Sequence, residues 1–298
     1  MMRNKGFGIC RIFSRTIFIK LSICLLLLST AVVAQKSTVI VKDGIVLNGV
    51  FEQGGLIIGK VTSGSTVWFD HKLLSVTPGG QFVFGFGRDA SDSSQIAWKS
   101  PGQIKKNLEI LIVKRTYNVQ EINGVAKKMV TPKKSQTDRI RSEVELVKKA
   151  RATMSKSTSF LEHFLPPLEG EITGVYGSQR VFNGTPKRPH YGLDFAAPTG
   201  TAVYAPASGV VTLTHKNMYY SGGTLILDHG YGVSSTFIHL SELMVENGQE
   251  VKAGELIAKV GSGGRSTGPH LDWRVNWFDV RIDPQFVLDI KHDALLTN

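Results

Sequence analysis

Cysteine is nearly absent from this chain. Among its 298 residues only Cys10 and Cys24 are cysteines, and both lie within the first 34 residues. Once those residues are removed, the chain has no thiol with which to form a disulfide. The segment Leu21-Ser-Ile-Cys24 loosely resembles a lipoprotein box, so a lipid on Cys24 is an alternative. Four leucines follow Cys24, which places it inside an apolar run and disfavours lipidation.

Long apolar runs are also scarce after the N-terminal segment. None approaches the roughly 18 uncharged residues of a membrane span, which predicts that the bulk of the chain is soluble. No dense cluster of lysine and arginine is interleaved with aromatic residues, which disfavours nucleic acid as a partner. The formal net charge of +11 includes five cations of the N-terminal segment, and the remaining +6 suits an anionic polymer.

Residues 1–34 have the composition of a secretory signal peptide. Positive charge without any acid precedes an apolar run at residues 21–33, and Val32-Val33-Ala34 offers small residues for cleavage before Gln35. The alternative is an uncleaved inner-membrane anchor, since the apolar run could extend across Lys20. Either interpretation predicts that the remainder is exported. The five cations are Arg3, Lys5, Arg11, Arg15 and Lys20.

The remainder divides into three pieces and a tail, residues 291–298, and we expect an all-β fold. Residues 35–122 alternate short apolar runs with glycine turns, which predicts a small β-sandwich of immunoglobulin type. Residues 165–290 have the same character and almost no helical periodicity, which predicts a second antiparallel β domain. The runs expected to form strands are 38–41, 56–58, 66–69, 82–86 and 108–113 in the first domain, and 170–175, 201–203, 209–214, 224–227, 234–239, 255–260 and 270–276 in the second.

Between the two β domains, residues 123–164 form a basic linker. Ser135-Gln-Thr-Asp138 can cap a helix, and Ile140, Val144 and Val147 recur at helical spacing among lysines and arginines. The helix is either a spacer that contacts a surface or a solvated helix packed on a neighbouring domain, and the second is favoured.

Residues able to bind a metal gather in the second β domain. His190 and Asp194 are four apart, and His270 and Asp272 are two apart on an expected strand, so the last two point to the same face. Imidazole and carboxylate both bind zinc, at about 2.0–2.2 Å, and three protein ligands leave an open position for catalysis. The sequence therefore predicts one zinc ion, held by His190, Asp194 and Asp272.

Amide hydrolysis at such a site needs further groups. Zinc polarises a carbonyl and lowers the pKa of a bound water to about 7. A base for the water and a hydrogen-bond donor for the developing oxyanion complete the requirement. His239 and His270, which ligation leaves free, are predicted to fill these catalytic roles.

Five short motifs follow one another along the second β domain. They are His190-Tyr-Gly-Leu-Asp194, Phe195-Ala-Ala-Pro-Thr-Gly-Thr201, His239-Leu-Ser241, Val251-Lys-Ala-Gly-Glu255 and Gly264-Arg-Ser-Thr-Gly-Pro-His-Leu271. Together they resemble the LytM and lysostaphin-type zinc metallopeptidases, over about residues 166–289.

The resemblance implies a compact antiparallel β fold, one zinc ion and cleavage of peptide bonds in bacterial peptidoglycan. It implies zinc ligation by His190 and Asp194 and catalysis by His239 and His270. The N-terminal pieces look like those of exported Gram-negative members, which implies the periplasm.

Asp272 departs from the family pattern, which usually has a third-ligand histidine there. A carboxylate can replace that ligand, although two carboxylates neutralise more of the metal's charge than one. Alternatively, Asp272 pairs with Arg274 or Arg265 and leaves only two ligands. His229 could in principle supply the third ligand, but we interpret it as a turn residue.

Three functions are compatible with these motifs. The favoured one is an exported zinc metalloendopeptidase that hydrolyses peptide cross-links of peptidoglycan, with its stem peptides as substrates. The second is a non-catalytic LytM-like regulator that activates a cell-wall amidase or acts on other envelope proteins. The third is a carrier domain, because residues 248–257 resemble the turn of biotinyl and lipoyl domains. The chain has no Met-Lys-Met attachment hairpin, which disfavours the third.

Overall fold

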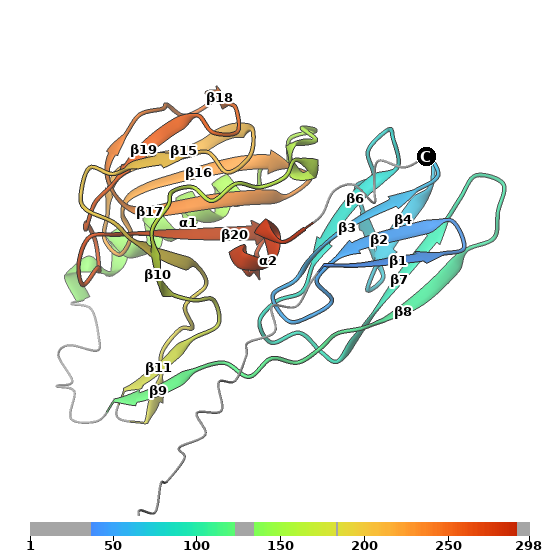
Figure 1. The fold of residues 1–298 in the computed structure, drawn as a ribbon, viewed down its shortest axis with the longest axis horizontal. Helices are drawn as coiled ribbons and strands as arrows, with labels where there is room; N and C mark the ends of the chain where they lie inside the picture. The colour runs from blue at the N-terminus through green and yellow to red at the C-terminus, as the bar shows by residue number, and fades with distance from the viewer. Residues whose placement is uncertain (1–36, 123–133, 183, 291–298) are drawn as a thin grey trace, which may run out of the picture. The chain divides into compact units, whose positions relative to one another are not determined.

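Two four-stranded antiparallel sheets share one apolar core in the N-terminal part of the chain (Figure 1). The computed structural model describes residues 37–122, 134–182 and 184–290. The first sheet has the strand order β1-β2-β3-β6, and the second has the order β5-β4-β7-β8. The bounds are β1 Thr38–Lys42, β2 Ile45–Gly49, β3 Leu56–Val61, β4 Thr66–Phe69, β5 Lys72–Leu74, β6 Gln81–Gly85, β7 Ser93–Lys99 and β8 Lys106–Leu111.

Inward-facing aromatic side chains join these two sheets. Phe69 from β4 stacks on Phe84 from β6, with ring centroids 4.5 Å apart. The β1–β2 hairpin turns at Asp43 and Gly44, whose φ angles of 49° and 88° are the left-handed pair that suits a two-residue hairpin. The all-β fold class predicted from the sequence is confirmed. The immunoglobulin-like description of the sandwich stays a prediction.

A ten-stranded sheet forms most of the second β domain. Along β20, Leu271, Trp273 and Val275 are fully buried in its core, so the residues between them face the other side. The main path is β10-β13-β20-β17-β16-β15-β18, with β14, β19 and β21 paired beside it, and a separate sheet has the order β12-β11-β9. The bounds are β9 Val119–Ile122, β10 Glu171–Gly174, β11 Gln179–Phe182, β12 Thr185–Pro186, β13 Leu193–Ala196, β14 Ala202–Tyr204, β15 Gly209–Met218, β16 Gly222–Gly230, β17 Val233–Leu243, β18 Glu250–Val251, β19 Leu256–Val260, β20 His270–Trp277 and β21 Val280–Ile282.

The described part of the linker contains helix α1 (Thr137–Ala152), which follows a short 3-10 helix, Lys134–Gln136. The predicted cap is wrong. The N-cap residue is Gln136 and makes no side-chain cap hydrogen bond, because Ser135 lies inside the 3-10 turn and not at the start of the α-helix. Within the described ranges, none of the helices has the length and apolar character needed to cross a membrane.

Helix α1 packs along one face of the ten-stranded sheet, beside β15 and β16 (Figure 1). Arg139 donates to the carbonyl oxygen of Asn217 at 2.6 Å. The buried Glu143 accepts a hydrogen bond from the backbone nitrogen of Tyr219 at 2.8 Å. The favoured expectation, a helix packed on a neighbouring domain, is confirmed.

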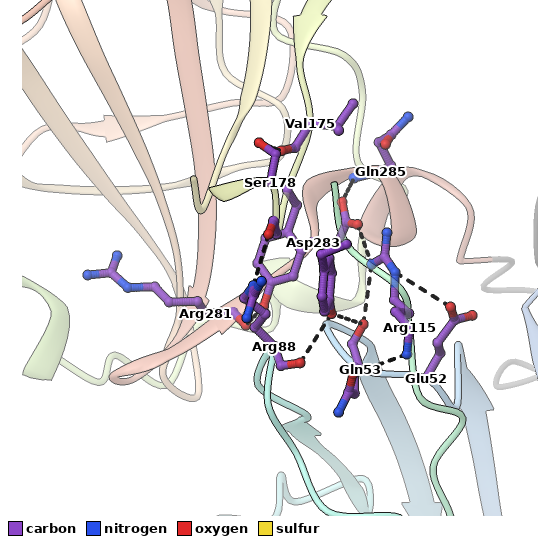
Figure 2. Close-up of polar contacts among 12 residues, drawn as sticks. Glu52, Gln53, Arg88, Arg115, Val175, Ser178, Arg281, Asp283 and Gln285 are labelled. Carbon is purple, nitrogen blue, oxygen red and sulfur yellow. Dashed lines mark hydrogen bonds and ion pairs between the residues drawn. The ribbon is translucent and has the colours of Figure 1, made fainter. Parts of the chain in front are cut away.

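A buried ion pair links the two β domains, which belong to one compact unit, Gln35–Asn298. Figure 2 shows Arg115 between two carboxylates: its Nη1 lies 2.7 Å from Asp283 Oδ2, and its Nε lies 3.5 Å from Glu52 Oε1. Asp283 is 1% exposed and also caps the short helix α2 (Pro284–Leu288) by accepting from the backbone nitrogen of Gln285 at 3.0 Å. The Asp283 carboxylate therefore stabilises both the contact between the two β domains and the start of α2.

Apolar residues extend the same interface. Leu56 and Val83 of the first sheet belong to the apolar cluster that contains Ile282 and Val287 of the second domain. Gly85 on β6 lies so close to Ile282 that a Cβ at this position would overlap its side chain. The β-sandwich is thus attached to the second domain by packing as well as by charge.

Candidate metal site and its catalytic histidines

Strand pairing brings the three predicted ligands together. Asp194 on β13 lies directly opposite Asp272 on β20. His190 precedes β13, and its backbone nitrogen donates to the carbonyl oxygen of Ser178 at 2.7 Å. One ligand atom from each of the three side chains lies within 4.8 Å of the other two. The sequence did not predict β13 as a strand, because Leu193–Ala196 is only four residues long and contains the charged Asp194.

Two buried atoms of these side chains make no hydrogen bond within the described part of the chain. His190 Nε2 and Asp194 Oδ1 lie 3.2 Å apart, yet both are buried without a hydrogen-bond partner among the described residues. Burying unpaired polar atoms costs free energy, and native structures rarely leave them so. A divalent cation between them would satisfy both, so the residues present fit a metal.

Two glycines make room for the carboxylates. A Cβ on Gly174 would overlap Asp194, and a Cβ on Gly192 would overlap Asp272 Oδ1. The second glycine lies inside the His190-to-Asp194 motif, so its position is set by the same segment that supplies two ligands. These glycines were not identified as site residues from the sequence, because the close approach arises from strand pairing.

Arg274 binds the carboxylate of the third proposed ligand, Asp272, through two hydrogen bonds. Its Nε donates to Asp272 Oδ1 at 2.8 Å and its Nη2 donates to Asp272 Oδ2 at 2.6 Å. Burial alone would raise the pKa of Asp272, but the charge and hydrogen bonds of Arg274 lower it below the usual range. Of the two partners considered from the sequence, the structure selects Arg274, whereas Arg265 stacks on Tyr220 at 4.6 Å from the ring centroid.

The Asp272–Arg274 pair is compatible with metal binding. Asp272 Oδ2 also faces His190, whose Nδ1 lies 4.0 Å away. A carboxylate oxygen has more than one lone pair, so it can accept from arginine and still face a cation. The pair carries no net charge, as a neutral histidine ligand would carry none. Arg274 therefore offsets the extra negative charge that aspartate brings to the site.

His239 and His270 lie side by side, with ring centroids 4.8 Å apart. His239 Nδ1 lies 2.7 Å from the carbonyl oxygen of Gly263, and His270 Nδ1 lies 2.9 Å from that of Gly268. A carbonyl oxygen only accepts, so each Nδ1 carries a proton, and in the neutral form of each ring the lone pair is on Nε2. Burial lowers the pKa of His239, in spite of its hydrogen bond to Gly263, which favours the neutral ring.

These five side chains can support hydrolysis of an amide. A divalent metal held by His190, Asp194 and Asp272 would supply Lewis acidity to a peptide carbonyl. His239 or His270 can accept a proton at Nε2 and return it to a leaving amine. Their Nδ1 bonds to backbone carbonyls fix the orientation of both rings.

His229 is a core residue, and its interpretation as a turn residue is wrong. It is fully buried on β16, with Nδ1 2.8 Å from the carbonyl oxygen of Ser208 and Nε2 2.9 Å from Ser235 Oγ. Both ring nitrogens are occupied by these contacts. His229 is therefore not available as a third ligand.

Comparison with protein families assigns residues 188–284 to Peptidase family M23. This part of the chain is an M23 peptidase domain. The resemblance to LytM-type peptidases seen in the sequence is confirmed, and the assigned range contains all five residues of the candidate site.

Two curated relatives match this chain over part of their own length. The peptidoglycan DD-endopeptidase ShyA of Vibrio cholerae serotype O1 is 42% identical over 87 residues, which are 29% of this chain and 20% of ShyA. ShyB of the same organism, also named a peptidoglycan DD-endopeptidase, is 41% identical over 126 residues, or 42% of this chain and 29% of ShyB. The chain therefore matches less than a third of the length of these two curated relatives.

One solved structure resembles more of the chain. A crystal structure from Pseudomonas aeruginosa, assigned to peptidase family M23, superposes with a TM-score of 0.62 at 25% identity. The superposition covers 80% of this chain and 95% of that one. The structural likeness thus extends well beyond the M23 domain.

Gly192→Ala is expected to weaken metal binding by the M23 domain. The added methyl group would overlap Asp272 Oδ1 and lie 2.9 Å from Arg274 Cγ, which forces the carboxylate out of position. We expect about a 10- to 100-fold loss of metal affinity, as when groups that orient a ligand are disturbed. Competition with a chromophoric chelator measures it. Gly87→Ala is the control, because a Cβ there has only an ordinary contact of 3.9 Å with Val280; equal affinities for all three proteins would contradict the prediction.

Proposed function

We propose that this protein is an exported zinc metalloendopeptidase that hydrolyses peptide cross-links in peptidoglycan and acts in the periplasm of a Gram-negative bacterium. One observation carries the proposal: ligand atoms of His190, Asp194 and Asp272 lie within 4.8 Å of one another, and buried atoms of His190 and Asp194 have no hydrogen-bond partner among the described residues. The M23 assignment and the names of the two Vibrio relatives support the substrate class. The composition of residues 1–34 supports export.

The second candidate is a non-catalytic regulator of a cell-wall amidase. The bidentate pairing of Asp272 with Arg274 favours it, because a carboxylate engaged by arginine binds a metal less strongly than a free one. Against it stand the remaining groups, since His190, Asp194, His239 and His270 are all in place.

Metal analysis combined with digestion of purified peptidoglycan separates the two candidates. We expect about one zinc ion per chain in the wild type and release of peptides. Asp272→Asn keeps the size and one of the two hydrogen bonds from Arg274 but removes the charge, so we expect metal affinity to fall at least about 10-fold and peptide release to fall with it. Glu246→Gln, at an exposed position of the same domain outside the site, is the control.

Each failure of this experiment has a different meaning. A wild type without zinc and without peptide release would overturn the peptidase proposal and favour the regulator. Unchanged zinc affinity in Asp272→Asn would exclude Asp272 as a charged ligand and leave the rest of the site to be reassigned.

A further inference from the structure

Three arginine side chains gather on the face of the sheet that carries the candidate site. Arg274 and Thr236 are directly opposite each other on β20 and β17, and Arg281 on β21 is opposite Asn276 on β20. Arg151, from the last turn of α1, reaches the same place by donating from Nη2 to Thr236 Oγ1 at 3.0 Å. The linker helix thus places the positively charged Arg151 side chain near Arg274, which binds Asp272.

These arginines have too few carboxylates to balance them. Arg274 is paired with Asp272, but among the described residues neither Arg151 nor Arg281 forms an ion pair. Arg151 Nε is buried and has no hydrogen-bond partner in this part of the chain. Arg281 donates to Asn276 Oδ1 at 3.2 Å, and its guanidinium lies over the Tyr191 ring, 5.6 Å from the centroid. Figure 2 shows its side chain extending away from the Arg115–Asp283 cluster.

Such an arrangement is costly without an anion. Burial, together with the charge of Arg274, lowers the pKa of Arg281 to about 10, so the fold works against its charged form. For Arg151, burial and the charges of Arg281 and Arg274 also lower the pKa. Guanidinium groups bind carboxylates through two parallel hydrogen bonds, and clusters of them without counter-charges are typical of anion sites.

Two of the three arginines, Arg274 and Arg281, can be reached by a ligand. The Arg274 side chain is 26% exposed although it holds Asp272. Arg281 and Tyr191 line an open cleft of about 490 Å³, and Tyr191 directly follows the ligand His190. Arg274 also holds the ligand Asp272, so a ligand group in contact with Arg274 would lie beside the metal position.

We propose that Arg151, Arg274 and Arg281 form a subsite that binds a carboxylate of the peptide substrate next to the bond to be cleaved. The proposal rests on the proposed function for its substrate and adds a determinant of substrate choice. Asp272 links the two sites, because its carboxylate is shared between Arg274 and the metal position. In this arrangement Arg151 and Arg281 orient the substrate through the N–H groups that bind no other described residue.

The test compares two forms of one probe. The probe is a cross-linked stem-peptide dimer from peptidoglycan, with its carboxylates either free or converted to methylamides. Binding is measured by calorimetry with the full chain in a His239→Ala background, which prevents turnover and keeps the metal ligands and arginines. Hydrolysis is measured separately with His239 intact.

Arg151→Gln is expected to weaken binding of the free-carboxylate probe by about 10- to 100-fold and leave the methylamide probe unchanged. In hydrolysis the loss should appear in KM, with kcat nearly unchanged. Arg151→Lys keeps the charge and loses the planar fork, so we expect an intermediate effect. Lys149→Gln, which removes an exposed charge from the same helix, is the control. Arg281→Gln provides a second variant if Arg151→Gln unfolds.

The outcomes separate the subsite from the proposed function. Equal losses for both probes, or no loss of the free-carboxylate probe in either variant, would overturn the subsite. A carboxylate preference that depends on Arg151 in a protein that hydrolyses neither probe would support the subsite and refute the peptidase. Hydrolysis without any carboxylate preference would support the peptidase and refute the subsite.

Discussion

His190→Ala is expected to remove the metal from the M23 domain and to lower peptidoglycan hydrolysis by more than about 100-fold. His190 is one of the three proposed ligands, and its buried Nε2 has no hydrogen-bond partner in the described part of the chain. Without it, Asp194 and Asp272 remain as two carboxylates, and one of them is held by Arg274. Metal content after dialysis and the rate of peptide release measure the two effects.

The control for this substitution is His215→Ala. His215 lies on β15 of the same domain, outside the candidate site, where its Nδ1 accepts from the backbone nitrogen of Asn217. We expect this variant to keep wild-type metal content and activity. Stoichiometric zinc in a folded His190→Ala protein would contradict the predicted ligand set.

Asp283→Ala is expected to lower the free energy of unfolding by about 3–5 kcal/mol, the range for breaking a buried ion pair. The substitution leaves the half-buried Arg115 without its nearest carboxylate, which lies 2.7 Å away, and removes the cap of α2. Arg115 keeps only its longer contact with Glu52, at 3.5 Å, so the lost short ion pair and the lost helix cap account for the cost. Urea denaturation of the full chain measures the change.

An exposed ion pair of the same length provides the matched control. Lys114 Nζ also lies 2.7 Å from a carboxylate, that of Asp92, but both side chains are largely in solvent. Water screens such pairs, so Asp92→Ala should leave stability nearly unchanged. Similar losses in the two variants would show that the Arg115–Asp283 pair is not the source of the interface stability.

The order of short apolar runs and turns was enough to predict much of the fold. Residues 66–69 form β4 with the predicted bounds, and the run at 270–276 is β20 apart from its last residue. The sequence could not predict α2, whose five residues are too few to show helical periodicity. It also missed β13, because Asp194 interrupts a short apolar segment that only pairing with β20 makes a strand.

In the candidate site, too, some residues could be predicted from the sequence and others could not. Residue types and spacing were enough to propose His190, Asp194 and Asp272, because zinc ligands are few in kind. Contacts between distant segments were not predictable. Arg151 lies 121 residues before Asp272 in the numbering, and only the packing of α1 on the sheet brings it near β17. The charge of the site therefore depends on the tertiary structure.

Packing of the linker helix on the sheet has a consequence for work with shortened proteins. A chain that begins at residue 165 retains all five candidate site residues and the whole range assigned to the M23 family, but it lacks Arg151. On the proposed arginine subsite, such a fragment is expected to bind substrate carboxylates less tightly than the intact protein does. Substrate screens on the isolated peptidase domain would then rank acidic peptides too low.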